Sequence, residues 1–382
     1  MKIAVFIYSL GGGGAERVVS QLIPYLENNG FDVYLVLMNN TCVYPFETKN
    51  KPFFLENSKT TESNVMKFLK IPFLAYKYHI FLKKNKINKS FSFLTRPGFI
   101  SVLTKWFNKK RTIIISERSN SSLQYGNHNL QSWINNFLIK ELYPKADLII
   151  ANSNGNAQDL ITNYNVPRYK ITTIYNPISL EAIFAIEPKK DFFDTNYFNL
   201  VSVGRLDKGK NHQLLIKSLE FFKLQKVRLY IFGDGILKTE LEKTIQDLKL
   251  ENYVFLMGFE SNIYKYLKAA DLFVFSSNHE GFPNVILEAM ACELPIVSTN
   301  CPSGPNEIFK VNTDYDFSDN VVTDYGILVP RNNIKKMVEA INILMQNKKY
   351  YQNCKTQVVK RVEDFEANKI LDEFKLHLLN HK

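Results

Sequence analysis

Short, almost continuously apolar runs recur along the first half of the sequence and, after a break, along the second half. The first series is "IAVFIY", "DVYLVLM", "SFSFL", "TIIIS" and "ADLIIA", and the second is "FNLVSVG", "VRLYIFG", "YVFLMG", "DLFVFSS" and "PIVST". Runs of this kind are typical of parallel strands that are covered on both faces. Helical stretches such as "GAERVVSQLIPYLENN" separate them. The pattern therefore predicts an α/β protein with two doubly wound parallel sheets and right-handed crossovers.

The break, near residues 180–197, divides the chain into two Rossmann-like halves. At 382 residues the chain is also too long for one ordinary core. We expect an N-terminal domain at 1–182 and a C-terminal domain at 197–362, with helices at the end of the chain. Ligands of doubly wound sheets bind beyond the carboxyl ends of the strands, so two facing domains would enclose a cleft.

The cysteines and the apolar runs exclude several classes of protein. Four cysteines are scattered along the chain and form no C-x-x-C pair, namely Cys42, Cys292, Cys301 and Cys354. This spacing predicts free thiols in a reducing compartment and no zinc site. No run approaches the roughly 18 apolar residues of a membrane span. The opening "MKIAVFIYSL" leads directly into "GGGGAER", which favours a first strand over a signal peptide.

Residues 65–89 form a basic segment without a single acid, within a chain whose net charge is +11. Its lysines are interleaved with apolar and aromatic side chains, and "KWFNKKR" at 105–111 continues the theme. A basic helix with aromatic residues suits a protein that rests on an anionic bilayer. The alternative is an amphipathic helix whose lysines are only solvated. No nucleic-acid-binding motif accompanies the charge, so nucleic acid is not an expected partner.

A glycine-rich loop, "SLGGGGAERV", follows the first strand and opens a helix. Its glycines allow close backbone approach, and a helix N-terminus offers free N–H groups to an anion. The loop is therefore a candidate site for an anion. The loop departs from the G-x-G-x-x-G fingerprint, and the second strand ends in "VLMNN" without an acid for a ribose, which argues against a dehydrogenase. A plain strand-to-helix turn remains the alternative.

The second half places cations and glycines after its first two strands. In "VSVGRLDKGKNHQLLI", Gly204, Arg205 and Lys210 follow the first of them, on the expected ligand side. Two permanent cations there can neutralise a diphosphate, although a pair of surface basic residues is the alternative. In "IFGDGILKTEL", Gly233 marks either a ligand contact or a tight turn with a capping Asp234.

The segment "NHEGFPNVILEAMACELP" sets Glu280 and Glu288 with seven residues between them. Pro283 is a natural first residue of a helix, and the apolar residues after it predict a buried helix. A carboxylate such as Glu288 on a buried helix needs a partner. The free N–H groups near Asn284 would point at the ligand. Carboxylates, cations and a helix N-terminus together suit a nucleotide diphosphate joined to a polyhydroxylated group.

These blocks resemble the retaining glycosyltransferases of family four, which have the GT-B fold of two facing Rossmann-like domains with a cleft between them. "EGFPNVILE" is similar to the family's E-x-seven-E pattern, and "MACELPIVST", "CPSGPNEI" and "YGILVP" also look like its blocks. The resemblance implies that Glu280 faces the donor sugar, that Glu288 binds the ribose, and that Arg205 and Lys210 hold the diphosphate. It also implies that Gly281, Phe282 and Pro283 line the donor, and that a helix at 363–382 crosses back onto the first domain. In the glycine-rich loop, it implies that Gly13 and Gly14 bring backbone N–H groups to the phosphates and that Glu16 contacts the substrate.

Two departures from the family pattern stand out. Relatives have Gly where this chain has Glu293, so we expect the conformation of the turn to differ there. Relatives place a sugar-contacting His after the fourth strand, where this chain reads "IISERSN", and either Glu117 or Arg118 takes that place. The family pattern implies no metal site and no cofactor.

The resemblance extends to the acceptor. "FIYSLGGGGAERVVSQLIPYL" and "MKFLKIPFLAYKY" look like transferases that extend glycans on undecaprenyl diphosphate, especially N-acetylgalactosamine transferases of bacterial protein glycosylation. It implies transfer from a UDP-sugar to a lipid-linked glycan by a peripheral protein on the cytoplasmic face of the inner membrane. O-antigen or capsule transferases with another UDP-sugar, a UDP-sugar epimerase of the same fold, and a non-catalytic sugar-nucleotide-binding protein are the alternatives.

Overall fold

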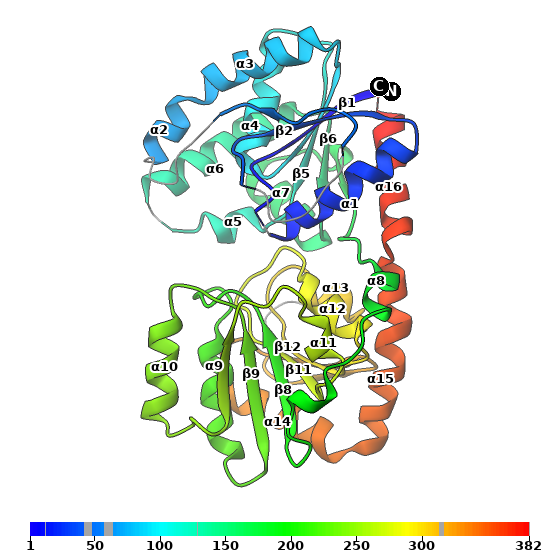
Figure 1. The fold of residues 1–382 in the computed structure, drawn as a ribbon. Coiled ribbons are helices and arrows are strands. Elements are labelled where there is room, and N and C mark those ends of the chain that lie inside the picture. The colour runs from blue at the N-terminus through cyan, green and yellow to red at the C-terminus, as the bar shows by residue number, and fades with distance from the viewer. Residues whose placement is uncertain (12, 42–47, 57–63, 128, 313–316, 382) are drawn as a thin grey trace. The chain divides into compact units, whose positions relative to one another are not determined.

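The computed structural model describes the chain apart from residues 12, 42–47, 57–63, 128, 313–316 and 382, so Cys42 lies outside it. The described chain divides into two compact units. The first unit comprises residues 1–177 and 368–382, and the second comprises 178–367 (Figure 1). The segment 180–197, expected as a linker, lies within the second unit. There the backbone N–H of Lys189 donates to the carbonyl of Lys265 at 2.8 Å.

The first unit is built on a parallel sheet with helices on both faces (Figure 1). Its strand order is β3-β2-β1-β4-β5-β6-β7, so the order reverses between β1 and β4. The strands are β1 (Lys2–Ile7), β2 (Asp32–Leu37), β3 (Phe53–Phe54), β4 (Lys89–Phe93), β5 (Thr112–Glu117), β6 (Leu148–Ala151) and β7 (Ile171–Thr173). The helices are α1 (Gly14–Asn28), α2 (Asn64–Leu69), α3 (Ile71–Lys84), α4 (Thr95–Leu103), α5 (Ser121–Gln124), α6 (Leu130–Leu142), α7 (Asn154–Tyr164) and α16 (Ala367–Asn380).

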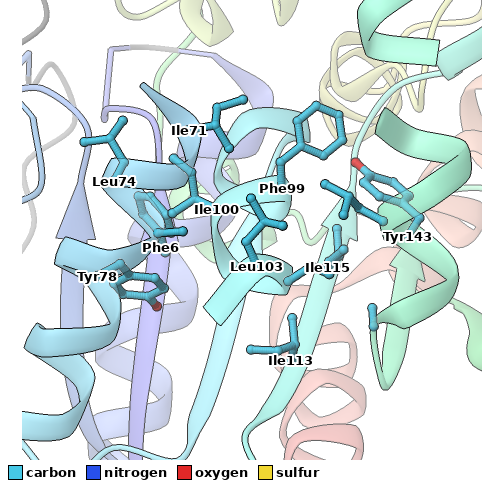
Figure 2. Close-up of a cluster of buried hydrophobic side chains, with 14 of the residues drawn as sticks. Phe6, Ile71, Leu74, Tyr78, Phe99, Ile100, Leu103, Ile113, Ile115 and Tyr143 are labelled. Carbon is cyan, nitrogen blue, oxygen red and sulfur yellow. The ribbon is translucent and has the colours of Figure 1, made fainter. Parts of the chain in front are cut away.

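The core of the first unit explains why the basic segment is helical. Figure 2 shows Ile71, Leu74 and Tyr78 of α3 directed at Phe6 of β1 and at Ile100 of α4. These α3 residues recur every three or four positions, the spacing of one helical face. The sequence predicts one basic helix here; the structure has two, α2 and α3, with Lys70 between them. Pro72 in the first turn of α3 fits this start, because proline is best tolerated there.

The last helix, α16, completes the first unit. The ring of Phe374 lies 6.0 Å from that of Phe91 on β4, and Phe374 is fully buried. Tyr25 on α1 donates its hydroxyl to Asp372, and the ammonium of Lys89 donates to the carbonyl of Leu378. The helix α16 therefore belongs to the same folded unit as the strands and helices of residues 1–177.

The second unit repeats the architecture. Its order is β10-β9-β8-β11-β12-β14-β13, all parallel except β13, and the order reverses between β8 and β11. The strands are β8 (Phe198–Val203), β9 (Val227–Phe232), β10 (Val254–Gly258), β11 (Leu272–Phe275), β12 (Ile296–Thr299), β13 (Val321–Thr323) and β14 (Gly326–Val329). The helices are α8 (Leu180–Phe184), α9 (His212–Ser218), α10 (Lys238–Asp247), α11 (Tyr264–Leu267), α12 (Asn284–Ala291), α13 (Pro305–Ile308), α14 (Ile334–Gln346) and α15 (Lys348–Val362).

The prediction of two doubly wound α/β sheets is confirmed, and each of the ten expected strands is present. Short 3₁₀ helices complete the backbone, namely η1 (Thr104–Trp106), η2 (Tyr143–Lys145), η3 (Arg168–Lys170), η4 (Lys190–Phe192), η5 (Leu219–Phe222) and η6 (Glu363–Phe365). One boundary was wrong: α12 begins at Asn284, and Pro283 is its N-cap rather than its first residue.

Candidate functional site

The second unit brings a lysine and a glutamate together where its strand order reverses. The loops after β8 and β11 both leave the carboxyl edge of the sheet and lie beside each other, because these strands are neighbours. Doubly wound sheets bind ligands at such a switch point. The ammonium of Lys210 lies 2.6 Å from the Oε1 of Glu280. Both side chains are mostly buried, at 20% and 14% exposed, so the ion pair is only partly screened by water.

The loop before α9 holds Lys210 in place from several directions. Its backbone N–H donates to the Oδ1 of Asp207 at 3.0 Å, and its carbonyl accepts from the hydroxyl of Ser276 at 2.8 Å. Its ammonium lies 5.6 Å from the ring centre of Phe275, at the end of β11. A Cβ on Gly204 would lie 3.2 Å from the Lys210 stem, so glycine leaves room for it. Lys210 is thus a preorganised cation.

The two loops are also bonded to each other through their backbones. The backbone N–H of Asn278 donates to the carbonyl of Gly209 at 2.8 Å, and its side-chain amide donates to the carbonyl of Lys208 at 3.0 Å. These bonds fix the distance between the two loops and hence the Lys210–Glu280 pair. The sequence analysis missed Asn278, Asp207 and Ser276. Their position directly after β8 and β11 was the available signal.

Arg205 lies apart from this pair. Its side chain is 82% exposed, and it forms an ion pair with the Oδ2 of Asp207 at 3.2 Å. Asp207 therefore supports both cations, through its carboxylate to Arg205 and to the backbone of Lys210. An exposed ion pair of this kind contributes little to stability. Arg205 is thus a solvent-exposed cation near the carboxyl edge of the sheet.

Gly233 shapes the edge of the site through its backbone. Its φ of +142° is one that side chains rarely adopt, and a Cβ would lie 1.9 Å from the carbonyl oxygen of Gly204. The backbone N–H of Gly204 donates to the carbonyl of Phe232 at 2.9 Å, so the turns after β8 and β9 are in close contact. Asp234 accepts from the N–H of Gly235 and is not the N-cap of α10, which is Leu237.

Glu288 lies on α12, where it is 5% exposed, and the segment Gly281–Pro283 leads into this helix. The ring of Phe282 packs 5.5 Å from that of Phe365. Gly304, at φ +102°, makes room for Pro283, because a Cβ there would lie 2.5 Å from the proline Cδ. The two residues that lead into α12 are therefore packed in place, Phe282 against Phe365 and Pro283 against Gly304.

The turn at Glu293 has the conformation that glycine adopts in such positions. Glu293 ends α12 with φ +62°, and its N–H donates to the carbonyl of Met290 at 3.0 Å. The N–H of Leu294 donates to the carbonyl of Ala289 at 3.0 Å. These two bonds form a Schellman motif, which satisfies the last carbonyls of the helix. The turn keeps its geometry without glycine, at the cost of a left-handed non-glycine residue.

Two buried groups beside the site stay uncharged near neutral pH. Burial lowers the pKa of His212 to about 4, and the nearby charge of Lys210 lowers it further, while backbone contacts at Gly204 oppose the shift. Burial raises the pKa of the Cys301 thiol, and so does the charge of Glu280. The charged groups that face this site are consequently the carboxylates and cations, not the histidine or the thiol.

In the first unit, the glycine-rich loop ends at Gly13, the N-cap of α1, and Gly12 lies outside the described residues. Glu16 folds back over the first turn of the helix that begins at Gly14. A Cβ on Gly13 would lie 2.4 Å from its Oε2. Burial raises the pKa of Glu16, although its own backbone N–H lowers it in part. Glu16 thus occupies the helix N-terminus, where a carboxylate is stabilised by the helix dipole.

Both candidates for the missing histidine are buried at the end of β5. Glu117 is fully buried, accepts from the hydroxyl of Tyr143 at 2.6 Å and from that of Ser119 at 3.0 Å, and has its pKa raised by burial. Arg118 is 9% exposed and donates to Ser116 and Asn176. The carboxylate of Glu117 thus accepts hydrogen bonds within the protein, whereas the guanidinium of Arg118 donates only to neutral groups.

The outer face of the first unit carries an exposed aromatic surface on α2, α3 and the turn after α4. Its members are Leu69, Phe73, Tyr76, Ile80, Trp106 and Phe107, each between 45% and 69% exposed. The rings of Tyr76 and Phe107 lie 5.6 Å apart, which joins α3 to that turn. Several large apolar side chains exposed on neighbouring elements are typical of an interaction site.

The residues that the structure describes contain no group of three or more His, Cys, Asp or Glu side chains arranged to hold a metal ion. No helix among them has the length and apolar character to cross a membrane.

Two family models match the chain, one in each half. Residues 12–182 match the model described as Glycosyltransferase Family 4, and residues 184–361 match the model described as Glycosyl transferases group 1.

Relatives match over almost the whole chain. A Campylobacter jejuni protein named N-acetylgalactosamine-N,N'-diacetylbacillosaminyl-diphospho-undecaprenol 4-alpha-N-acetylgalactosaminyltransferase is 39% identical over 99% of both chains. A second protein of that organism, named GalNAc-alpha-(1->4)-GalNAc-alpha-(1->3)-diNAcBac-PP-undecaprenol alpha-1,4-N-acetyl-D-galactosaminyltransferase, is 26% identical over 98% of this chain and 97% of its own. The solved structure of Anabaena Alr3699/HepE in complex with UDP has a TM-score of 0.78 at 20% identity, over 99% of both chains.

Proposed function

This chain belongs to glycosyltransferase family four, which has the GT-B fold, and we propose that it transfers N-acetylgalactosamine from a UDP-sugar to a glycan carried on polyprenyl diphosphate. The resemblance seen in the sequence is thereby confirmed at the level of the family and fold. The choice of sugar and carrier rests on the name of the relative that is 39% identical over 99% of the chain.

The observation that carries the proposal is the Lys210–Glu280 pair, with its 2.6 Å contact at the switch point of the second sheet. A sugar nucleotide needs a cation at its diphosphate and an acceptor of hydrogen bonds at its sugar. Lys210 supplies the first and Glu280 the second. Because the loop bonds fix Lys210 before any ligand arrives, little reorganisation is needed when the diphosphate leaves.

We assign the remaining roles around this pair. Arg205 closes on the diphosphate from the exposed side of the same loop. The N–H groups at the start of α12, near Asn284, bind phosphate oxygens, as a helix N-terminus does. Glu288 accepts from the ribose hydroxyls. In the first unit, the backbone N–H groups of the turn at Gly13 bind an anion when the Glu16 carboxylate moves away from the helix N-terminus.

The reaction retains the anomeric configuration under this proposal. The acceptor hydroxyl attacks the anomeric carbon from the face that the diphosphate leaves, while the bond from that carbon to the diphosphate oxygen breaks. The departing oxygen takes the hydroxyl proton, so no side-chain base is required. His212 fits this scheme, because burial lowers its pKa to about 4 and so makes it a weak base near neutral pH. Positioning and charge stabilisation then account for most of the catalysis.

The exposed aromatic surface supports a place on the cytoplasmic face of the inner membrane, where a polyprenyl-linked acceptor resides. Lys83, Lys84 and Lys86 lie exposed at the end of α3 and can face anionic headgroups. Not every lysine of the segment is available: Lys70 pairs with Glu56 at 3.3 Å, and Lys89 is buried. Apolar side chains with a basic border are the pattern of an interfacial contact.

Nucleotide release by the purified chain tests the proposal. UDP-GalNAc, UDP-GlcNAc, UDP-Gal, UDP-Glc and GDP-Man are each assayed with and without extracted polyprenyl-diphosphate glycans. We expect acceptor-dependent release of UDP from UDP-GalNAc. Acceptor-dependent release from another UDP-sugar would instead support an O-antigen or capsule enzyme, and interconversion of UDP-sugars without acceptor would support an epimerase. Absence of release from every donor, with the lipid present, would contradict transfer to this class of acceptor.

A further inference from the structure

Polar side chains follow three neighbouring strands of the first sheet at its carboxyl edge. Arg118 follows β5, Asn152 follows β6 and Asn176 follows β7, and these strands are adjacent in the sheet. The amide of Asn152 donates to the carbonyl of Arg118 at 3.2 Å, and the guanidinium of Arg118 donates to the Oδ1 of Asn176. The three loops are thus bonded to one another around Arg118, on the ligand side of the sheet.

Arg118 is a buried cation without an ion-pair partner among the described residues. It is 9% exposed, and its guanidinium donates to two neutral oxygens, those of Asn176 and of Ser116 at 3.3 Å. The oxygens of Glu117, its neighbour in the chain, instead accept from Tyr143 and Ser119. A guanidinium has five N–H donors, so several of those on Arg118 remain for another acceptor.

The surroundings of Arg118 favour an anion. Burial lowers the pKa of Arg118 to about 9, with Glu117 opposing the shift through space, so the side chain still carries its charge near neutral pH. A buried charge with only neutral partners is costly, and a bound anion removes that cost. The planar fork of arginine suits phosphate in particular.

Arg111, at the opposite end of the same strand, shows that burial alone does not make a binding site. It is 2% exposed and contacts His79 at 3.2 Å and the carbonyl of Thr104 at 3.4 Å. Its Nε is enclosed without a partner, whereas no nitrogen of Arg118 is both enclosed and unpartnered. The Nε–H of Arg118, which donates to none of the described residues, is therefore not enclosed in the fold as the Nε–H of Arg111 is.

We propose that Arg118 binds a phosphate oxygen of a diphosphate at the carboxyl edge of the first sheet, with Asn176 orienting its guanidinium. The diphosphate belongs either to the nucleotide donor or to the polyprenyl acceptor, and this choice rests on the proposed function. The anion site itself does not, because it follows from the burial, bonding and position of Arg118.

Calorimetric titration of the full-length chain tests the site with inorganic pyrophosphate, UDP and farnesyl diphosphate as probes. Because Lys210 offers a second cation, each titration is repeated in the Lys210→Ala background. We expect Arg118→Gln to weaken pyrophosphate binding in that background by roughly 10- to 100-fold, the scale for losing hydrogen bonds to a charged group. A matching loss with UDP assigns the site to the donor, and one with farnesyl diphosphate assigns it to the acceptor. Unchanged binding of all three probes overturns the proposal.

Arg111→Gln is the matched control, since it removes a buried guanidinium from the same strand. It should lower the melting temperature and leave the three affinities unchanged. If Arg118→Gln does not fold, Arg118→Lys and Asn176→Ala replace it, and wild-type affinity in both overturns the site. The two proposals fail separately: Arg118-dependent pyrophosphate binding in a chain that releases no UDP would contradict the transferase function and leave the anion site standing.

Discussion

The ammonium of Lys210 gains its importance from the groups that hold it. Asp207, Ser276 and the ring of Phe275 fix the lysine, and Glu280 faces it at 2.6 Å. The sequence identified Lys210 and Glu280 because both follow a strand on the ligand side. It did not identify Asn278 or Asp207, since their bonds depend on β8 and β11 being neighbours, which is a property of the sheet and not of either segment.

At this scale we expect Lys210→Ala to lower turnover by roughly 10²- to 10³-fold, the effect of losing one preorganised electrostatic donor. Steady-state release of UDP with acceptor present measures it. Lys208→Ala is the control, because its side chain is exposed on the same loop and only its carbonyl bonds Asn278. Turnover in Lys210→Ala that equals that of the control would remove Lys210 from the mechanism.

His212 predicts a pH dependence of stability. Burial lowers its pKa in the folded chain to about 4, so the unfolded chain binds the proton more readily between that pH and about 6.5. Its contribution is complete above about pH 6.5 and is lost as the pH falls toward 4. We expect His212→Asn to flatten the decline of unfolding free energy over this range. Urea unfolding at a series of pH values measures it, and parallel curves for the two chains would contradict the assignment.

At the scale of elements, the apolar runs were enough to place the ten principal strands, because strands buried on both faces are apolar throughout. Four strands were not predicted from the sequence: β3 has two residues, β7 is the polar "ITT", and β13 and β14 form an antiparallel pair at the sheet edge. The strands β3, β7 and β13 are short and only partly buried, so they leave no continuous apolar run, and the fully buried β14 contributes only the three apolar residues "ILV". The basic segment was read correctly as helical, but its division at Lys70 and its two faces became clear only from packing.

The outer face of α3 carries its own prediction. Phe73 is 66% exposed there, and burying a phenylalanine ring at a membrane surface contributes on the order of 1.5–3 kcal/mol. We expect Phe73→Ser to weaken cosedimentation with vesicles of phosphatidylethanolamine and phosphatidylglycerol by roughly tenfold. Phe259→Ser, at a ring 76% exposed in the second unit, is the matched control. Equal losses in both variants, or no binding of the wild type, would exclude α3 as the contact.

At the scale of the whole molecule, the chain forms two units, and the first unit is built from two separate stretches of the sequence. Residues 368–382 belong with the first 177, and the fully buried Phe374 packs on Phe91. Composition and periodicity indicated helices at the end of the chain without showing what they cover. The resemblance to a family supplied that expectation, because a contact across more than 280 positions leaves no local trace.

Phe374→Ala should therefore destabilise the first unit although it changes the last turns of the chain. The loss of a fully buried phenylalanine costs roughly 3–5 kcal/mol, so the melting transition of that unit should fall clearly. Leu376→Ala, two positions along the same helix at an exposed side chain, should have little effect. Differential scanning calorimetry measures both, and equal melting profiles would show that α16 is dispensable to the first unit.

The placement of α16 also bears on how the chain is made. Lys89 and Phe91 emerge from the ribosome early, but the carbonyl of Leu378 and the ring of Phe374 that cover them follow more than 280 residues later. Domains usually fold in the order of synthesis. In this chain the second unit has all its residues before the first one does, so the half that is translated first is the half that is finished last.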